Sequence, residues 1–130
     1  MNVLFIDDDP EDLELFSEAV KSFGPDYNVT MTTNGRDGVS LLKHTLPDFV
    51  FLDINMPAFD GKMVLKWIRR ERSLDSVRVC ILSTSITIAD CQMYKEMGAN
   101  HCLRKPSSFE ELKTSLLLAL KDNAPCSGLK

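Results

Sequence analysis

The residues best suited to chemistry stand at or just after the ends of short apolar segments. They are three carboxylates, an amide, two hydroxyls and an ammonium: Asp7, Asp8, Asp53, Asn55, Ser83, Thr84 and Lys105. Carboxylates that meet at one spot repel each other, because two unit charges 4 Å apart interact by about 4 kcal/mol at an effective dielectric near 20. Such a cluster persists only if protons or cations offset its charge.

The candidate ligands in this group are hard oxygen atoms. No cysteine or histidine stands at these positions, and the four cysteines form no C-x-x-C pair. Oxygen ligands favour Mg²⁺, which binds octahedrally and keeps several waters. The sequence therefore predicts a Mg²⁺ site, with Lys105 adding a further positive charge.

A carboxylate beside Mg²⁺ and an ammonium can act as a nucleophile toward phosphorus. Asp53 would then carry an aspartyl phosphate, and Ser83 could donate a hydrogen bond to a phosphoryl oxygen. No residue of the group is suited to act as a general base on an external substrate. We therefore expect a switch rather than an enzyme with turnover. Taken singly, each residue also fits a helix cap, a loop or a surface position, and the interpretation depends on their combination.

Short apolar segments alternate with amphipathic stretches along the chain. Strands are predicted at 3–6, 29–31, 49–52, 77–82 and 102–103. The spacing of Leu13, Phe16, Val20 and Phe23 marks the apolar face of a first helix, which Asp9 can cap and in which Pro10 fits the first turn. Further helices are predicted at 34–46, 61–72, 87–97 and 108–122, and Gly98 is a suitable stop for the fourth.

Five β–α units in series predict a doubly wound α/β domain with a five-stranded parallel sheet. In such sheets ligands bind at the carboxyl ends of the strands, which is where the group above is expected to converge. The second strand ends in the turn 32–35, to which we assign no function. One domain is expected over 1–122, and the tail 123–130 is expected to be disordered.

The net charge of −4 argues against non-specific nucleic-acid binding. The first 20 residues hold seven acidic residues and no base, whereas 62–78 is basic and is interpreted as one solvated helix face. No apolar run approaches the roughly 18 residues of a membrane helix. The N-terminus lacks the basic region of a secretory signal. We therefore expect a cytoplasmic protein.

Four segments together resemble response-regulator receiver domains. They are Val3–Pro10, Asp53–Pro57 with Asp60-Gly61, Ile81–Ser85, and Gly98–Asn100 with Lys105-Pro106. The resemblance covers about residues 1–122 and implies a flavodoxin-like strand order of 2-1-3-4-5 with five helices. It also implies a single-domain receiver of a two-component system.

The resemblance also implies roles for individual residues. Asp53 becomes the phosphoacceptor, Lys105 the cation that contacts the phosphoryl group, and Ser83 the switch hydroxyl with Thr84 beside it as a binding residue. Mg²⁺ would be held by Asp8, by Asp53 and by the backbone carbonyl of Asn55, with Asp7 acting through water. The Lys105–Pro106 bond is expected to be cis.

The resemblance implies partners as well. The phosphoryl donor would be a histidine kinase or a histidine phosphotransfer protein. An unidentified downstream protein would bind the face formed by the fourth helix, the fifth strand and the fifth helix. The family usually has an aromatic residue three positions before the lysine, where this chain has Cys102. That departure puts the usual aromatic rotamer switch in doubt.

Three other functions compete with this interpretation. A phosphatase of the haloacid-dehalogenase type would need a second aspartate at position 55, where this chain has Asn55, and usually a cap domain. A pseudo-receiver would only bind partners, although the candidate site positions carry competent residues. A nucleotide-binding module would need a G-x-G-x-x-G turn, and the first strand is followed by aspartates instead.

Overall fold

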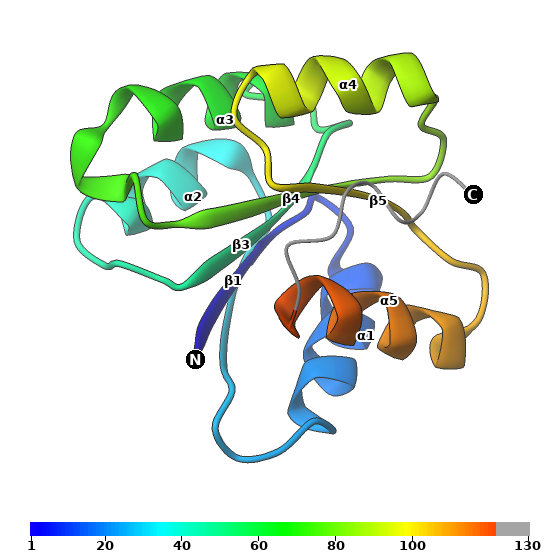
Figure 1. Cartoon of the computed structure of the whole chain (residues 1–130). Coiled ribbons are helices and arrows are strands. Elements are labelled where there is room, and N and C mark those ends of the chain that lie inside the picture. The colour runs from blue at the N-terminus through cyan, green and yellow to red at the C-terminus, as the bar shows by residue number, and fades with distance from the viewer. Residues whose placement is uncertain (122–130) are drawn as a thin grey trace.

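Five parallel strands form one sheet in the order β2-β1-β3-β4-β5, in a computed structural model that describes residues 1–121 (Figure 1). The strands are β1 (Asn2–Ile6), β2 (Asn28–Thr32), β3 (Phe49–Asp53), β4 (Arg78–Ser83) and β5 (His101–Arg104). The helices are α1 (Pro10–Lys21), α2 (Gly35–Leu42), α3 (Gly61–Arg70), α4 (Ile88–Glu96) and α5 (Phe109–Lys121), with a 3₁₀ helix η1 (Arg72–Leu74) after α3. The predicted doubly wound fold and its strand order are confirmed.

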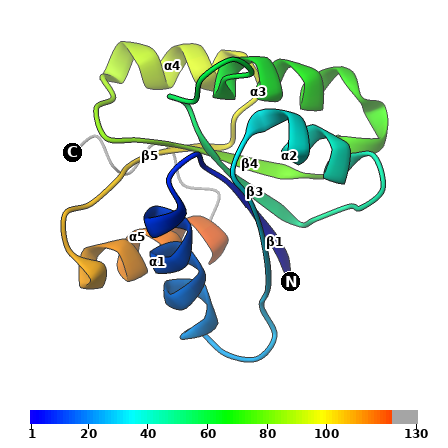
Figure 2. The same ribbon diagram turned by 180° about the vertical axis from the view of Figure 1, so that it is seen from behind.

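Helices cover both faces of the sheet. Helices α1 and α5 lie on one face, and α2, α3 and α4 lie on the other (Figures 1 and 2). Alternate residues of each central strand therefore enter two separate cores. Phe5 and Phe51 stack with ring centroids 4.8 Å apart in the α1–α5 core, whereas Leu4 and Leu52 belong to the other. Burial on both faces explains why the central strands read as unbroken apolar runs.

Polar side chains cap the starts of several helices, and Asp9 does so as predicted. Asp9 Oδ1 accepts a hydrogen bond of 3.0 Å from the Glu11 backbone N–H at the start of α1. Thr87 and Asp90 form a reciprocal capping box at the start of α4. Ser108 Oγ accepts from the backbone N–H of Glu111 at 3.1 Å and so satisfies an amide at the start of α5. These side chains satisfy N–H groups that have no partner within the helix.

Helices α2 and α3 end earlier than predicted, and α4 ends at Glu96 rather than Met97. Helix α2 stops at Leu42 rather than Leu46, because the backbone tightens after it: the Leu41 carbonyl accepts from the His44 N–H and from the Thr45 hydroxyl at 2.8 Å. Helix α3 stops at Arg70, and the chain continues as η1. The predicted end of α5 at Asp122 and the tail 123–130 lie outside the described residues.

Arg69 corrects the interpretation of the basic stretch as a single solvated face. Its guanidinium is half-buried and donates to the carbonyls of Gly98 at 2.9 Å, Val77 at 2.8 Å and Leu74 at 3.3 Å, and to Asn100 Oδ1 at 3.2 Å. The neighbouring basic residues do face solvent: Lys62, Lys66, Arg70 and Arg72. Arg69 therefore ties α3 to the start of β4 and to the α4–β5 connection.

Among the helices within residues 1–121, none has the length and apolar character to cross a membrane. On α5, Leu118 is half exposed whereas Leu116 and Leu120 are buried, so this helix carries more leucine than its buried face needs. Cys80 and Cys102 are free and fully buried, one in each core.

Candidate functional site

The first strand delivers two aspartates to the carboxyl edge of the sheet. Asp7 follows β1 directly, and its side chain is 1% exposed. Its Oδ1 accepts a hydrogen bond of 2.9 Å from the Asp9 backbone N–H. Asp8 is exposed, yet it offers a carboxylate oxygen to the same place. The turn into α1 therefore points one carboxylate inward and leaves the other at the entrance.

Asp53 is the last residue of β3 and is 3% exposed. Its Oδ1 accepts from the Asn55 backbone N–H at 3.2 Å. Gly61, at the start of α3, comes very close to this strand end, and a Cβ at that position would lie 2.5 Å from the Asp53 carbonyl oxygen. Only glycine permits that approach, so Gly61 allows α3 to begin directly beside the candidate acceptor.

Ser83 ends β4 and is completely buried. Its hydroxyl donates to the Ser85 carbonyl at 2.9 Å and accepts from the Ser85 N–H at 3.3 Å. Asn55 Nδ2 also donates to it at 3.5 Å, a side-chain contact that the sequence did not predict. Thr84, the next residue, is exposed at the start of the same loop. The hydroxyl of Ser83 thus connects the β3 end to the loop that precedes α4.

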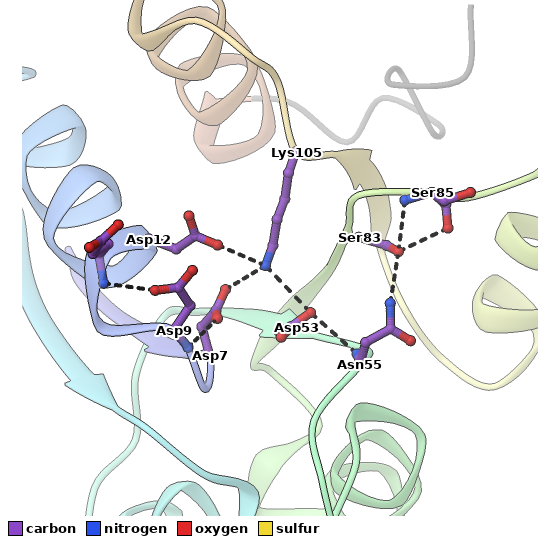
Figure 3. Close-up of polar contacts among 9 residues, drawn as sticks. Asp7, Asp9, Asp12, Asp53, Asn55, Ser83, Ser85 and Lys105 are labelled. Carbon is purple, nitrogen blue, oxygen red and sulfur yellow. Dashed lines mark hydrogen bonds and ion pairs between the residues drawn. The ribbon is translucent and has the colours of Figure 1, made fainter.

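Lys105 joins the two acidic strand ends (Figure 3). Its Nζ lies 2.8 Å from Asp7 Oδ2, 3.2 Å from Asp12 Oδ2 and 3.5 Å from Asp53 Oδ1. The lysine side chain is 12% exposed. The structure therefore brings together Asp7, Asp8, Asp53 and Lys105 as the sequence predicted, and it adds Asp12, whose position on α1 gave no signal of this contact.

Burial and mutual repulsion set the protonation of the two inner carboxylates. Burial raises the pKa of Asp7 despite the close contact with the Lys105 ammonium. Burial, followed by the negative charge of Asp7, raises the pKa of Asp53 to about 6, although Lys105 and the Asn55 N–H oppose the shift. Burial would lower the pKa of Lys105, but the close contact with Asp7 and the charges of Asp7 and Asp53 outweigh that effect and raise it. The site therefore carries more negative charge than its lysine offsets.

Carboxylate oxygens of Asp7, Asp8 and Asp53 lie within 4.8 Å of one another. Asp7 Oδ2 is buried and makes its ion pair to Lys105 without a well-aligned hydrogen bond, so this oxygen is incompletely satisfied. Hard oxygen ligands with uncompensated negative charge match the preferences of a divalent cation such as Mg²⁺. The residues present therefore fit a metal ion.

One backbone expectation is wrong. No peptide bond within residues 1–121 is cis, so the Lys105–Pro106 bond is trans. A proline peptide prefers trans by only about 0.5–1 kcal/mol, so small differences in the surrounding loop decide between the isomers and the dipeptide alone cannot. The Lys105 N–H nevertheless donates to the Ser83 carbonyl at 2.7 Å, which places the lysine beside the end of β4.

Comparisons with known proteins identify the family and agree with the fold. Residues 3–117 match the family described as the response regulator receiver domain. Protein PilH of Pseudomonas aeruginosa is 29% identical over 110 residues, which cover 85% of this chain and 89% of PilH. The DNA-binding dual master transcriptional regulator RpaA of Synechocystis is 31% identical over 125 residues, which cover 95% of this chain and 51% of RpaA.

Other relatives are longer than this chain. The chain spans 40% of Stress response regulator protein 1 of Candida tropicalis and, as with RpaA, about half the length of several other curated relatives. Among solved structures, the chemotaxis response regulator CheY4 of Vibrio cholerae superposes with a TM-score of 0.81 at 25% identity, over 91% of this chain and 97% of CheY4.

Proposed function

Because this chain belongs to the response regulator receiver domain family, we propose that it is a phosphorylation-dependent switch that accepts a phosphoryl group on Asp53 with the help of Mg²⁺. Receiver domains are signalling modules of two-component systems, which sets the general function. The observation that carries the specific proposal is the ion pairing of Lys105 with both Asp7 and Asp53 at one edge of the sheet.

In the proposed reaction, a carboxylate oxygen of Asp53 attacks the phosphorus of the donor. A new O–P bond forms as the bond from phosphorus to the donor's imidazole nitrogen breaks, and that nitrogen leaves with the electron pair. The product is a mixed carboxylic–phosphoric anhydride on Asp53. The chain is then both reagent and product, so it needs no further catalytic turnover to act as a signal.

The neighbours of Asp53 have distinct tasks in this proposal. Lys105, already 3.5 Å from Asp53 Oδ1, would move onto a phosphoryl oxygen. The Ser83 hydroxyl would leave the Ser85 carbonyl, 2.9 Å away, and donate to another. Thr84, the exposed residue after Ser83, would bind at the edge of the phosphoryl group. These exchanged contacts differ between the two states, and such a difference is what allows a modification to shift a conformational equilibrium.

The divalent ion would be held by Asp8, by Asp53 and by the backbone carbonyl of Asn55, with Asp7 reaching it through water. Bound there, Mg²⁺ would supply positive charge to the phosphoryl oxygens during transfer. Asp8 is exposed, which would let the ion enter the site from solvent. Asp7 is buried and would form the inner side of the ion site.

The donor in this proposal is a histidine kinase or a histidine phosphotransfer protein. We place the switch in the cytoplasm, where phosphohistidine is made from ATP. The downstream protein would bind the surface of α4, β5 and α5, since the Ser83–Ser85 contact leads directly into α4. Leu118 of α5 is half exposed and would be an apolar contact point for that partner. One domain over 1–122 suffices for all of these roles.

Intact-mass spectrometry with acetyl phosphate and Mg²⁺ tests the proposal. Wild-type protein should gain one phosphoryl group, and Asp53→Asn should gain none. An adduct that persists in Asp53→Asn would place the acceptor elsewhere. Wild-type protein that gains no phosphoryl group from acetyl phosphate or from a phosphorylated histidine phosphotransfer protein would instead indicate a receiver that only binds partners.

A further inference from the structure

Lys105 has a third carboxylate partner, Asp12, in addition to Asp7 and Asp53. Asp12 belongs to the first turn of α1, and its Oδ2 accepts a hydrogen bond of 3.2 Å from Lys105 Nζ. Its side chain is 31% exposed, so it stands at the entrance of the site rather than inside it. Phe16, four residues further along α1, has its ring centroid 6.0 Å from the same Nζ. One side of α1 therefore forms a wall against the ammonium.

The distances place Lys105 on the α1 side of the site. Nζ lies 2.8 Å from Asp7 and 3.2 Å from Asp12, but 3.5 Å from Asp53 Oδ1 (Figure 3). An ammonium has three N–H donors. One of them is directed to Asp12, and the 2.8 Å contact with Asp7 is an ion pair without an aligned hydrogen bond. The separation from Asp53 exceeds the 2.7–2.9 Å of a strong charged hydrogen bond. The cation is thus held slightly away from the candidate acceptor.

We propose that Asp12 is a positioning residue that restrains Lys105 before phosphoryl transfer and releases it to the phosphoryl group afterwards. This inference depends on the proposed function, because it assigns Lys105 to the phosphoryl oxygens. Asp7 cannot substitute for Asp12 in this role, since it is 1% exposed and fixed by the Asp9 N–H. Asp12, on the surface of a helix, can lose the lysine to water at little cost.

Two effects of Asp12 act in the same direction. Its contact takes up one N–H donor that Lys105 would otherwise offer to a phosphoryl oxygen. Its negative charge at the entrance also repels an incoming phosphoryl donor, which is itself anionic. Asp12 therefore slows phosphorylation and weakens binding of a phosphoryl mimic. Removing its charge, while leaving Asp9 to cap α1, should reverse both effects.

The test compares Asp12→Asn with Glu14→Gln, which removes the same charge from an exposed position of the same helix. Phosphorylation by acetyl phosphate with Mg²⁺ is followed by the intact mass of the protein. Binding of beryllofluoride, the phosphoryl mimic, is measured by calorimetry. We expect Asp12→Asn to be phosphorylated about two- to fivefold faster and to bind beryllofluoride tighter by a similar factor, the range that a partly exposed ion pair supports. Glu14→Gln should stay close to wild type in both assays.

Two further measurements separate a local contact from a general charge effect. Asp12→Glu keeps the carboxylate, so its phosphorylation rate and its beryllofluoride affinity should be close to those of wild type. At about 0.5 M NaCl, where the Debye length is roughly 4 Å, the advantage of Asp12→Asn should persist, because the Asp12–Lys105 contact is shorter than that length.

Equal rates for Asp12→Asn and Glu14→Gln, or a slower reaction of Asp12→Asn than of wild type, would overturn the inference. If the faster phosphorylation of Asp12→Asn disappears in salt, the effect of Asp12 is only electrostatic repulsion of the anionic donor. That result would overturn the positioning role. Failure of wild-type protein to accept a phosphoryl group would contradict the proposed function instead, so the two failures are distinguishable.

Discussion

Lys105 Nζ lies 2.8 Å from Asp7 Oδ2, an oxygen on a side chain that is 1% exposed. This short contact directs the lysine toward Asp7, so the more distant Asp53 receives less of its positive charge. The fold therefore opposes the ionisation of Asp53 as well as that of Asp7, and the pKa of Asp53 rises to about 6 through burial first and the charge of Asp7 second.

The raised pKa predicts a pH-dependent stability without metal. The ordinary pKa of the group is 3.8, so folding disfavours the ionised form of Asp53. Its unfavourable contribution to the free energy of unfolding therefore grows as pH rises from about 4 to about 6. In EDTA, Asp53→Asn should be more stable than wild type by about 1–3 kcal/mol at pH 7, and the gain should shrink as pH falls to about 4. Urea unfolding between about pH 4 and pH 7 measures this difference in stability. A pH-independent difference would contradict the prediction.

Mg²⁺ should raise the melting temperature of wild-type protein. A ligand that binds only the folded state adds RT ln(1 + [L]/Kd), about 1.4 kcal/mol at ten times Kd. Asp8→Ala should lose most of this gain. The neighbouring Asp9→Ala is the control: it should destabilise α1 by about 0.5–2 kcal/mol through loss of its cap, yet keep the Mg²⁺ response. An equal Mg²⁺ response in Asp8→Ala and wild type would exclude a site at Asp8.

Signalling is expected to depend on Ser83 rather than on residue 102. Cys102 is fully buried but too small to vacate or fill the volume of an aromatic ring. Ser83, in contrast, is bonded to Ser85 in the loop that leads into α4. Amide exchange of α4, measured with and without beryllofluoride, should respond in Cys102→Ala and Ser83→Thr but not in Ser83→Ala. The opposite pattern for Cys102→Ala and Ser83→Ala would show that coupling takes another route.

Ala58 has a φ of +60° in the loop between β3 and α3, a conformation that favours glycine. Ala58→Gly should therefore stabilise the protein, by about 0.5–1 kcal/mol after the added flexibility of the unfolded chain is subtracted. Ala89→Gly, inside α4, should instead destabilise it by about 1 kcal/mol. Denaturant unfolding gives both values. A loss of stability in Ala58→Gly would show that the loop tolerates this conformation without strain.

The sequence was sufficient to predict where the inner site residues lie, for a simple physical reason. Parallel strands bring their carboxyl ends to one edge, so residues at or just after the ends of β1, β3 and β5 must meet there once the strands are identified. Asp7, Asp53 and Lys105 follow that rule, and the structure joins them. Helix starts were predictable as well, since caps such as Asp9 act within three residues of the chain.

Features that depend on packing between elements could not be predicted in this way. The contact of Asp12 with Lys105 joins α1 to the β5–α5 connection, and residues 93 positions apart carry no local signal of it. Arg69 has the sequence pattern of a solvated helix residue, but the α4–β5 connection packs over it. The early end of α2 and the positive φ of Ala58 arise from competing backbone hydrogen bonds and loop geometry, which side-chain periodicity does not report.

The hydrogen bonds of Arg69 have a mechanical consequence for α4. They fix the segment just after this helix, where the Gly98 carbonyl accepts at 2.9 Å and Asn100 is bonded to the same guanidinium. At its N-terminal end, α4 begins with Ile88, which is 63% exposed. This end follows the loop in which the Ser83 hydroxyl donates to the Ser85 carbonyl. Because the segment after its C-terminal end is fixed, α4 can rotate only about that end. Any displacement started at Ser83 would therefore be greatest in the first turn of α4 and would fade toward Glu96.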